Sequence, residues 1–563
     1  EYVLFGKPGE YKGKIQMTHP EIELSENFNQ PLKGGLEGVY STTEKLKARR
    51  LDSRAIRKLM ETLLPQVMNQ INESLPGYIR KRQELLPRSK ALMAIHFPSN
   101  SEELSTAQRT LKFEELFYMQ IRLMNIKAKR NKEIPGQVFE AVGDYFNTFY
   151  KNHLPFQLTK AQKRVIKEIR RDTANGIQMN RLLQGDVGSG KTMVALLCAL
   201  IAIDNGFQAA IMAPTEILAQ QHYESIFGLL SEMPINTALL TGSSKTTYRK
   251  KIHANLENGQ IHILIGTHAL LEDKVKFHNL GFVVIDEQHR FGVAQRSKLW
   301  RKNKIPPHVL VMTATPIPRT LAMTVYGDLD VSVIDELPPG RKPIKTVHMR
   351  DSNRLKMFGF MREEINKGRQ IYVVYPLIEE SEAFDYKDLM DGYESIVRAF
   401  PMPEYQLSIV HGKMKPEDKD FEMKRFSEAK TQIMVATTVI EVGVNVPNAS
   451  VMVIESAERF GLSQLHQLRG RVGRGAEQSF CILMTGNKLS NEGRKRISTM
   501  CETNDGFRIS EVDLKLRGPG DLMGTQQSGL IDFSIADLVK DTETLEKSSE
   551  EATYIFDNDP DLK

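Results

Sequence analysis

Short apolar runs alternate with stretches of helical spacing from position 155 onward, and they form two successive sets. The first set lies at 209–213, 262–266, 282–285 and 309–312, and the second at 371–375, 407–410, 432–436, 450–454 and 480–484. Continuously apolar strands that alternate with helices are typical of parallel sheets covered by helices on both faces. The two sets therefore predict an α/β fold with two lobes, at 155–340 and 341–486, divided by the turn-rich LPPGRK at 337–342.

The remaining residues follow other patterns. Glycines and prolines separate short strand-like runs in 1–38, which predicts the end of a small β domain. Apolar residues recur at helical spacing through 39–154, which predicts a helical linker. Residues 487–563 have the pattern of helices and loops and end in a charged stretch. A chain of 563 residues is long enough for several domains at roughly 100–200 residues each.

Charge is distributed unevenly along the chain. The net charge of +6 is mild and does not by itself indicate a nucleic-acid partner. Basic residues nevertheless outnumber acidic ones in 44–58, and 122–132 contains basic residues and no acidic one. Such segments suit a phosphate backbone, because neutralising phosphates releases counterions. A solvated helix face is an equally good interpretation of each segment alone.

Cysteine content and hydropathy indicate in which cellular compartment the protein resides. Cys198, Cys481 and Cys501 are far apart and lack metal-ligand spacing, which fits a reducing environment. No apolar run approaches the ~20 residues of a membrane helix. The chain starts at Glu1 without a signal-peptide pattern. These features predict a trimmed chain from a reducing cytoplasm.

GDVGSGKT at 185–192 fits the phosphate-loop pattern G-x-x-x-x-G-K-[ST], between an apolar run and a helix. Backbone N–H groups of such a loop and the following helix N-terminus bind phosphates. Lys191 is then expected at the β and γ phosphates and Thr192 at Mg²⁺. A chance glycine-rich turn is disfavoured by the flanking strand and helix. The predicted nucleotide-binding residues are Gly185, Asp186, Val187, Gly188, Ser189, Gly190, Lys191 and Thr192.

An apolar run at 282–285 ends in Asp286 and Glu287. Downstream of a phosphate loop, such a pair predicts a carboxylate that holds Mg²⁺ through water and a second that orients and deprotonates the attacking water. Asp286 is assigned the first role and Glu287 the second. His289 follows shortly after and is expected beside the γ-phosphate, although a lone histidine is more often structural.

The motifs together resemble those of superfamily-two helicases and translocases. GDVGSGKT, DEQH at 286–289 and TATPIPRT at 313–320 are similar to motifs I, II and III. ATTVIEVGVN at 436–445 and QLRGRVGR at 467–474 are similar to motifs V and VI. The resemblance implies two RecA-like lobes around an ATP site. It assigns Gly443 to the nucleotide, and Gln467, Arg471 and Arg474 to catalysis from the second lobe, where arginine forks suit a γ-phosphate.

The same resemblance implies nucleic-acid and base contacts. MAPTEILAQQH at 212–222 is similar to motif Ia, and PFQLTKAQ at 155–162 to the segment that reads adenine. Gln162 offers both a donor and an acceptor to the base, and Phe156 a stacking surface, with a core position as the alternative for Phe156. The implied DNA-contacting and translocation residues are Pro214, Thr215, Gln220, Thr241, Gly242, Thr267, His268 and His289.

Longer stretches narrow the resemblance to the RecG family of bacterial branch-migrating DNA helicases. One such stretch is DEQHRFGV at 286–293. The other is DGFRISEVDLKLRGPGDLMGTQQSG at 505–529, which is similar to a translocation motif built from a helical hairpin and a loop. Arg517, Gln526 and Gln527 are the implied duplex contacts; alternatively this loop only braces the second lobe. VYSTTEKL at 39–46 is similar to the linker that follows that family's wedge, so 1–38 are implied to be part of an oligonucleotide-binding-fold wedge.

The resemblance implies an ATP- and Mg²⁺-dependent DNA helicase that remodels branched DNA by Holliday-junction branch migration and fork reversal in recombination and repair. Its implied partners are forks, Holliday junctions, R-loops and single-stranded DNA-binding protein, and its implied state is a monomer. One alternative is a duplex translocase that displaces RNA polymerase, like the transcription-repair coupling factor. Another is a nucleotide-binding scaffold without hydrolysis, which would be expected to lack Glu287 or the arginine cluster.

Overall fold

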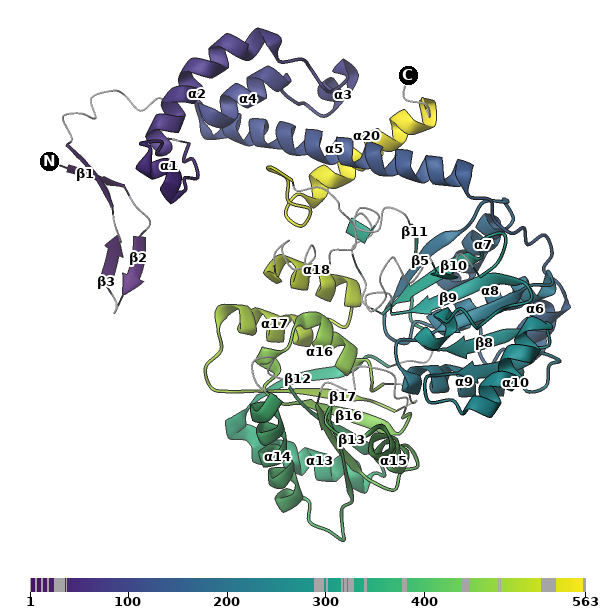
Figure 1. The fold of residues 1–563 in the computed structure, drawn as a ribbon. Helices are drawn as coiled ribbons and strands as arrows, with labels where there is room; N and C mark the ends of the chain where they lie inside the picture. The colour runs from purple at the N-terminus through teal and green to yellow at the C-terminus, as the bar shows by residue number, and fades with distance from the viewer. Residues whose placement is uncertain are drawn as a thin grey trace. The chain divides into compact units, whose positions relative to one another are not determined.

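The chain folds into two compact units, one of residues 1–122 with 531–563 and the other of residues 123–530 (Figure 1). The computed structural model describes residues 2–5, 8–11, 14–17, 20–24, 36, 38–287, 298–299, 302–314, 317, 321–322, 329–338, 342–376, 382–437, 446–473, 475, 477–517 and 533–559. Among the helices in those ranges, none is both long and apolar enough to cross a membrane.

The first lobe is built on a seven-stranded parallel sheet with the order β11-β5-β10-β9-β6-β8-β7. Its strands are β5 (Asn180–Gly185), β6 (Gln208–Met212), β7 (Thr237–Leu240), β8 (Ile263–Gly266), β9 (Leu280–Asp286), β10 (His308–Thr313) and β11 (Asp330–Ile334). Its helices are α7 (Lys160–Thr173), α8 (Lys191–Asp204), α9 (Glu216–Leu230) and α10 (Thr246–Glu257). The predicted parallel sheet of the first lobe is confirmed.

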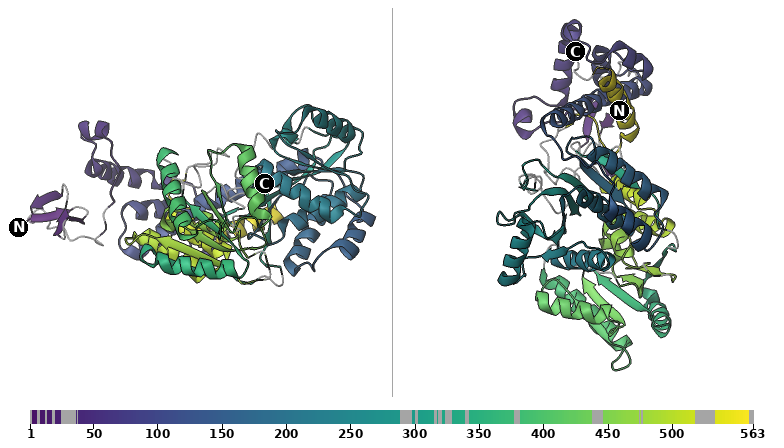
Figure 2. Two further views of the ribbon diagram at one scale, coloured as in Figure 1. Left: turned by 90° about the horizontal axis from the view of Figure 1, so that it is seen from below. Right: turned by 90° about the vertical axis from the view of Figure 1, so that its right-hand side faces the viewer.

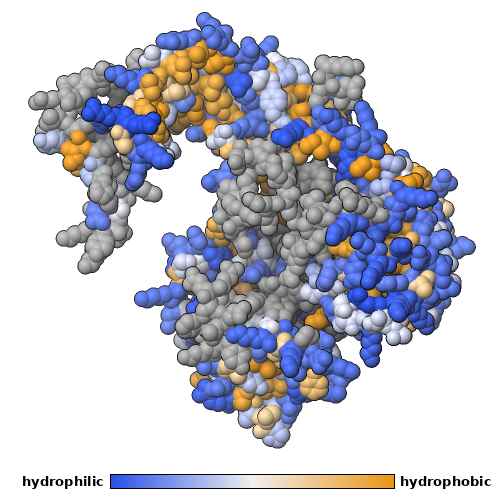
Figure 3. All heavy atoms as spheres, viewed as in Figure 1, coloured by the Kyte–Doolittle hydropathy of each residue, from blue (hydrophilic) through white to orange (hydrophobic). Residues whose placement is uncertain are grey.

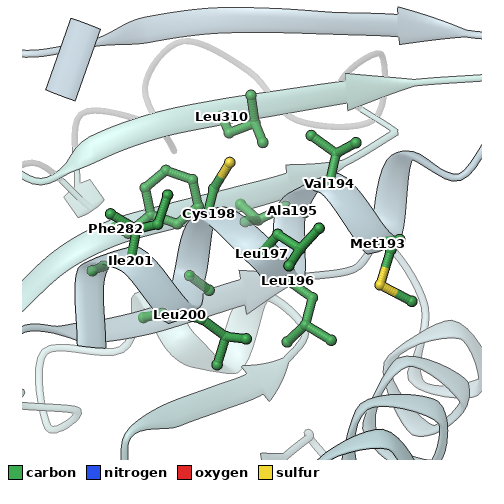
Figure 4. Close-up of a cluster of buried hydrophobic side chains, with 14 of the residues drawn as sticks. Met193, Val194, Ala195, Leu196, Leu197, Cys198, Leu200, Ile201, Phe282 and Leu310 are labelled. Atoms are coloured by element: carbon green, nitrogen blue, oxygen red, sulfur yellow. The ribbon is translucent and has the colours of Figure 1, made fainter. Parts of the chain in front are cut away.

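Successive side chains of a strand point to opposite faces, and both faces of this sheet are covered. Phe282 and Val284 of β9 join one hydrophobic cluster with α8, while Val283 and Ile285 join another with α10. Helix α8 is apolar around nearly its whole circumference because it is buried on the sheet. Figure 4 shows its side chains against Phe282 and Leu310.

The second lobe has a six-stranded parallel sheet with the order β12-β17-β16-β13-β15-β14, which confirms the second predicted set. Helices line its two faces, since alternate residues of β13 enter two different clusters (Figure 2). The strands are β12 (Lys345–Arg350), β13 (Gln370–Tyr375), β14 (Leu407–Val410), β15 (Ile433–Thr437), β16 (Ala449–Ile454) and β17 (Phe480–Thr485). The helices are α13 (Arg354–Asn366), α14 (Glu382–Ala399), α15 (Pro416–Ser427) and α16 (Leu462–Arg469).

Two consecutive helices follow the second lobe, α17 (Asn491–Glu502) and α18 (Gly506–Arg517). They pack on each other and on α16. Ser490 caps α17 by accepting from the Gly493 N–H at 3.0 Å. This pair, named the α17–α18 pair below, lies where a helical hairpin was predicted.

The first unit is mostly helical, as predicted for much of 39–154. Its helices are α1 (Glu44–Ala48), α2 (Ser53–Val67), α3 (Gly77–Arg82), α4 (Arg88–His96), the first part of α5 (Ser101–Glu133) and α20 (Thr542–Asn558). Hydrophobic residues gather on its surface over α2 and α4 (Figure 3), where Leu59 and Leu63 are exposed. They lie four positions apart and so share one face of α2.

The end of the chain returns to these helices, which the sequence did not predict. Glu115 on α5 accepts from the N–H groups of Ser534, Ile535 and Ala536. Lys112 pairs with Asp541 at 2.8 Å. The buried Glu551 of α20 accepts from Arg82 and Gln83 of the α3 region. Burying Glu551 is tolerable because donors surround its carboxylate.

The described residues of 2–24 form β1 (Tyr2–Phe5), β2 (Pro8–Tyr11), β3 (Lys14–Met17) and β4 (Glu21–Leu24). β1 pairs with β4 and β2 pairs with β3, both antiparallel, as two separate two-stranded sheets. An oligonucleotide-binding fold is therefore not evident among the described residues of this segment, because such a fold needs a larger, partly closed sheet.

His308 at the start of β10 joins the segment after α5 to the first lobe. Its Nδ1 accepts from the Met179 N–H at 2.9 Å, and its Nε2–H donates to the Gln137 carbonyl at 2.8 Å. These bonds require a neutral ring of one tautomer. Burial lowers the pKa of His308 to about 4, despite the opposing effect of the Gln137 carbonyl.

We expect the stability of the first lobe to fall as pH drops from about 6.5 to about 4. In that window the unfolded chain binds a proton that folded His308 does not, so the free energy of unfolding decreases, by up to about 3 kcal/mol at ~1.4 kcal/mol per pKa unit. Denaturant unfolding across this pH range measures the slope. His308→Gln should flatten it and the exposed control His278→Gln should not; equal slopes for both variants would contradict the assignment.

Candidate active site

The phosphate loop leaves β5 and opens α8, as its motif predicts. Gly188 and Gly190 have φ of +77° and +86°, a region that favours glycine. A Cβ on Gly190 would lie 2.3 Å from Nε2 of Gln162, so this position also requires glycine for space. The loop is thus pre-shaped by its own residues and by α7.

Lys191 is buried at the first position of α8. Its Nζ donates to the carbonyl oxygens of Gly185 at 2.8 Å and Asp186 at 3.0 Å, which holds the ammonium inside the loop. Burial lowers the pKa of Lys191, and the Glu287 and Asp286 carboxylates partly offset this. Thr192 follows at the next position of α8, half-buried at the mouth of the loop.

Gln162 braces the phosphate loop from α7. It is fully buried; its Oε1 accepts from the Thr159 N–H at 2.9 Å and its Nε2 donates to the Ser189 carbonyl at 2.8 Å. Both ends of the amide therefore bind protein groups here. Phe156 is 39% exposed, so its side chain does not belong to the hydrophobic core. Base contacts of Gln162 and Phe156 stay predictions.

Asp286 and Glu287 lie at the carboxyl end of β9, two strands from β5 in the sheet. Burial would raise the pKa of Asp286, but the hydrogen bond from His222 and the charge of Lys191 outweigh burial and hold this pKa below its usual range. Burial and the Asp286 charge instead raise the pKa of Glu287 to about 7. Glu287 has φ of +55°, a strained backbone typical of functional sites.

The second lobe contributes Arg471, which is buried and whose charge lowers the pKa of both Glu287 and Lys191. Its neighbour Gly470 also needs to be glycine, because a Cβ there would lie 2.7 Å from Cβ of Val187 in the phosphate loop. Gln467 lies half-buried on α16. Three other predicted site residues, His289, Gly443 and Arg474, lie outside the described residues.

His466 makes a second contact between α16 and the phosphate loop, and sequence reasoning missed it. Its Nε2 lies 2.5 Å from Oδ1 of Asp186. Burial would raise the pKa of Asp186, but the hydrogen bond from His466 contributes to holding it below its usual range. On its other side, Nδ1 of His466 lies 3.0 Å from Nη2 of Arg469.

The α17–α18 pair holds both ends of α16. At the N-terminus, Asp513 of α18 accepts from the Leu462 and Ser463 N–H groups and from Ser463 Oγ at 2.7 Å. At the C-terminus, the buried Arg469 donates to the carbonyls of Met500 and Thr503, both at 2.9 Å. The negative charge of Asp513 at the N-terminus of α16 and the positive charge of Arg469 at its C-terminus also complement the helix dipole. Any shift of α16 therefore acts on the pair.

The predicted DNA-contacting residues of the first lobe lie at the carboxyl ends of β6, β7 and β8, the edge that carries the phosphate loop on β5. In α/β sheets ligands bind at this edge. Pro214 and Thr215 precede α9, Thr241 and Gly242 follow β7, and Thr267 and His268 follow β8.

Glu216 connects two of these segments, and the sequence did not single it out. Its Oε1 accepts from the Ser243 N–H at 3.1 Å and its Oε2 from Ser243 Oγ at 2.6 Å, so the start of α9 is bound to the turn after β7. Gln220 on α9 donates to Glu224 at 2.7 Å and is exposed.

The predicted duplex contacts near the chain end are described only in part. Arg517 is the last residue of α18, and its side chain lies outside the described residues. Gln526 and Gln527 lie outside them altogether.

The residues at the loop fit Mg²⁺ bound together with a nucleotide. Magnesium keeps several waters and takes one or two protein oxygens plus phosphate oxygens in such sites. Thr192 and Asp286 supply a hydroxyl and an ionised carboxylate. Among the described residues no group of three or more histidine, cysteine or acidic side chains is placed to form a protein-only metal cage.

Known families match successive parts of the chain. The DEAD/DEAH box helicase family matches residues 159–324 and the helicase conserved C-terminal domain matches residues 355–476. With the phosphate loop and the Asp286–Glu287 pair, these matches define a helicase of the class with two RecA-like lobes. Residues 503–563 match the C-terminal part of domain 3 of ATP-dependent DNA helicase RecG.

Whole-chain relatives identify the family. The chain is 47% identical over 553 residues to the ATP-dependent DNA helicase RecG of Synechocystis, with 98% of this chain and 65% of that protein covered. It is 45% identical to the Bacillus subtilis RecG, with 97% and 79% covered. It also matches a structure of RecG bound to a three-way DNA junction at 40% identity and a TM-score of 0.69, over 96% of this chain and 70% of that one. The chain belongs to the RecG family of ATP-dependent DNA helicases.

The cap that α18 supplies to α16 makes a testable contribution. Asp513→Ala removes the acceptor of three donors and should lower the free energy of unfolding by about 1–2 kcal/mol. Asp513→Asn keeps an acceptor oxygen and should lose less. Denaturant titration measures both, with the exposed Glu511→Ala on the same helix as control; an Asp513→Ala loss no larger than that of the control would refute the cap.

Proposed function

We propose that this chain is an ATP-driven DNA motor that remodels branched DNA, by Holliday-junction branch migration and reversal of stalled replication forks in recombination and repair. One observation carries the motor: the segment of Gly470 and Arg471 in the second lobe lies against the phosphate loop of the first, where a Cβ on Gly470 would lie 2.7 Å from Cβ of Val187. Arg471 is also close enough to Lys191 and Glu287 to lower the pKa of both. Family membership supports the branched substrate, as does the likeness to a RecG structure bound to a three-way junction. The chain spans 65% of the length of its Synechocystis relative.

The proposed hydrolysis uses groups already in place. Lys191 would bind the β and γ phosphates, and Arg471 would bind the γ-phosphate. Both side chains carry positive charge beside the phosphate loop. Glu287 would orient and deprotonate the attacking water; a pKa of about 7 suits a base that works near neutral pH. Thr192 and Asp286 would hold Mg²⁺, which supplies charge neutralisation at the phosphates.

Transmission to DNA would run through α16. Because Asp513 and Arg469 bind α16 at its two ends, movement of the second lobe would carry the α17–α18 pair with it. Arg517, Gln526 and Gln527 would then grip duplex DNA beyond α18. Pro214, Thr215, Thr241, Gly242, Thr267 and His268 would contact the strand at the sheet edge.

The domain boundaries are part of this proposal: a partial wedge at 1–38, a helical linker at 39–154, lobes at 155–340 and 341–486, and a translocation segment with a tail at 487–563. The wedge would part the arms of a junction while the motor pulls duplex. Basic segments at 44–58 and 122–132 supply positive charge for phosphates. We propose further that the chain acts as a monomer on forks, Holliday junctions and R-loops. Single-stranded DNA-binding protein would be its protein partner.

Lys191→Ala should abolish ATP turnover while DNA binding persists, because the ammonium at the phosphates is lost and the nucleic-acid edge is untouched. Steady-state hydrolysis and fluorescence anisotropy with labelled forked DNA measure the two properties. Lys160→Ala, at the exposed start of α7, is the matched control and should retain turnover. Turnover by Lys191→Ala at the rate of the unmodified chain would refute the site.

Branch specificity needs its own measurement. ATP turnover should rise most with forked or junction DNA and less with linear duplex or single strands of equal length and concentration. Salt must be fixed, since phosphate contacts weaken steeply as ionic strength increases. Equal stimulation by all the DNA forms would leave the motor intact and reject the branched substrate.

A further inference from the structure

His222 joins helix α9 to the catalytic edge of the first lobe. Its Nε2 lies 2.9 Å from Oδ2 of Asp286, and both side chains are buried. A carboxylate oxygen accepts hydrogen bonds, so the imidazole N–H of His222 donates to Asp286. The contact follows from topology: β6, which leads into α9, is the sheet neighbour of β9, which ends in Asp286.

The other end of α9 lies among the proposed nucleic-acid contacts. Thr215 caps the helix, with its Oγ1 accepting from the Leu218 N–H at 3.3 Å. Glu216 binds the turn after β7 through Ser243, as described above. A strand that binds at this edge therefore contacts groups attached to α9.

The geometry of α9 suits it to carry a displacement. His222 follows Thr215 by about two helical turns, so the two residues share one face of the helix and lie about 10 Å apart along its axis. Helix α9 is also packed on the sheet through Ala219 and Ile226, both fully buried. A two-turn hydrogen-bonded segment is stiff over this length, so movement of its N-terminal end reaches His222.

We propose that His222 is a positioning residue that fixes the Asp286 carboxylate for Mg²⁺–nucleotide and couples binding of a DNA strand at the start of α9 to ATP hydrolysis. This rests on the proposed ATP site. Oδ2 of Asp286 is engaged by His222, which restricts the orientation of the carboxylate. Groups that orient a metal-binding carboxylate commonly change metal affinity by about 10–100-fold when they are removed.

A packing role for His222 predicts different behaviour. A histidine that only fills space between α9 and the sheet can be replaced by an apolar ring with no specific effect on Mg²⁺. A positioning histidine requires a donor that reaches Asp286. Glutamine places an amide N–H at nearly the distance of Nε2, whereas asparagine is too short and phenylalanine has no donor.

The test compares His222→Gln, His222→Asn and His222→Phe with the unmodified chain and with Ile226→Val, a control that loosens α9 at a buried position one turn away. Calorimetric titration with ADP, with and without Mg²⁺, gives a readout independent of turnover. The ratio of DNA-stimulated to basal ATP turnover gives the second, and thermal unfolding shows that each variant is folded.

We expect His222→Phe and His222→Asn to weaken ADP binding about tenfold in the presence of Mg²⁺ and to leave Mg²⁺-free binding unchanged. The stimulation ratio should fall by a similar factor, while His222→Gln and Ile226→Val stay within about twofold of the unmodified chain. Should His222→Phe not fold, the Asn and Gln pair carries the same comparison.

Folded Asn or Phe variants with unchanged Mg²⁺-dependent ADP affinity and an unchanged stimulation ratio would overturn the proposal. Failure of the ATP site itself has a separate signature: the unmodified chain would then show no turnover that depends on Lys191.

Discussion

Four charged side chains gathered at one point set the conditions for the rest of the structure: Lys191, Asp286 and Arg471, which are buried, and Glu287, which is half-buried. Removing an isolated charge from water costs several kcal/mol, so such a group is tolerable only where opposite charges and donors compensate it. Two cations and two carboxylates do so here. The compensation is unequal, since the pKa of Asp286 lies below its usual range while that of Glu287 is raised to about 7. In the proposed site the charged carboxylate would hold the metal ion, and its neighbour would exchange a proton with the attacking water.

That arrangement depends on both lobes. The phosphate loop and the acidic pair come from the carboxyl edge of the first sheet, and the arginine comes from the end of α16. Close approach between the lobes is built into the sequence at Gly470, where any side chain would collide with Val187. The His466–Asp186 contact adds a polar link beside it. Because Arg471 lies two residues beyond the end of α16, and Asp513 holds the start of that helix, the position of the arginine is tied to the α17–α18 pair.

Sequence patterns predicted the parts of the molecule that arise locally. The strand runs, the phosphate loop and the acidic pair each depend on neighbours along the chain, and they were recognisable from hydropathy and glycine spacing alone. Contacts between residues that are far apart in the sequence could not be recognised in this way. The Asp286 partner His222 becomes visible only when β6 and β9 are known to be adjacent. The return of 533–559 to α3 and α5 depends on single ion pairs such as Lys112–Asp541, which leave no periodic signal. For Gln162 the paired donor and acceptor were evident, but not that Thr159 and Ser189 would engage them.

Two helices each contribute one histidine to the proposed nucleotide site, and each histidine contacts an aspartate there. His222 of α9 binds Asp286, and His466 of α16 binds Asp186. The first helix starts at the proposed strand-contacting edge, and the second is clamped by the helix pair proposed to act on duplex. A neutral imidazole can donate from one ring nitrogen and accept at the other, so it can bond an aspartate on one side and a second group on the other, as His466 does with Arg469. Nucleotide and nucleic acid would then be linked by two separate rigid connections, one inside the first lobe and one across the cleft. Only the second of these requires the lobes to close.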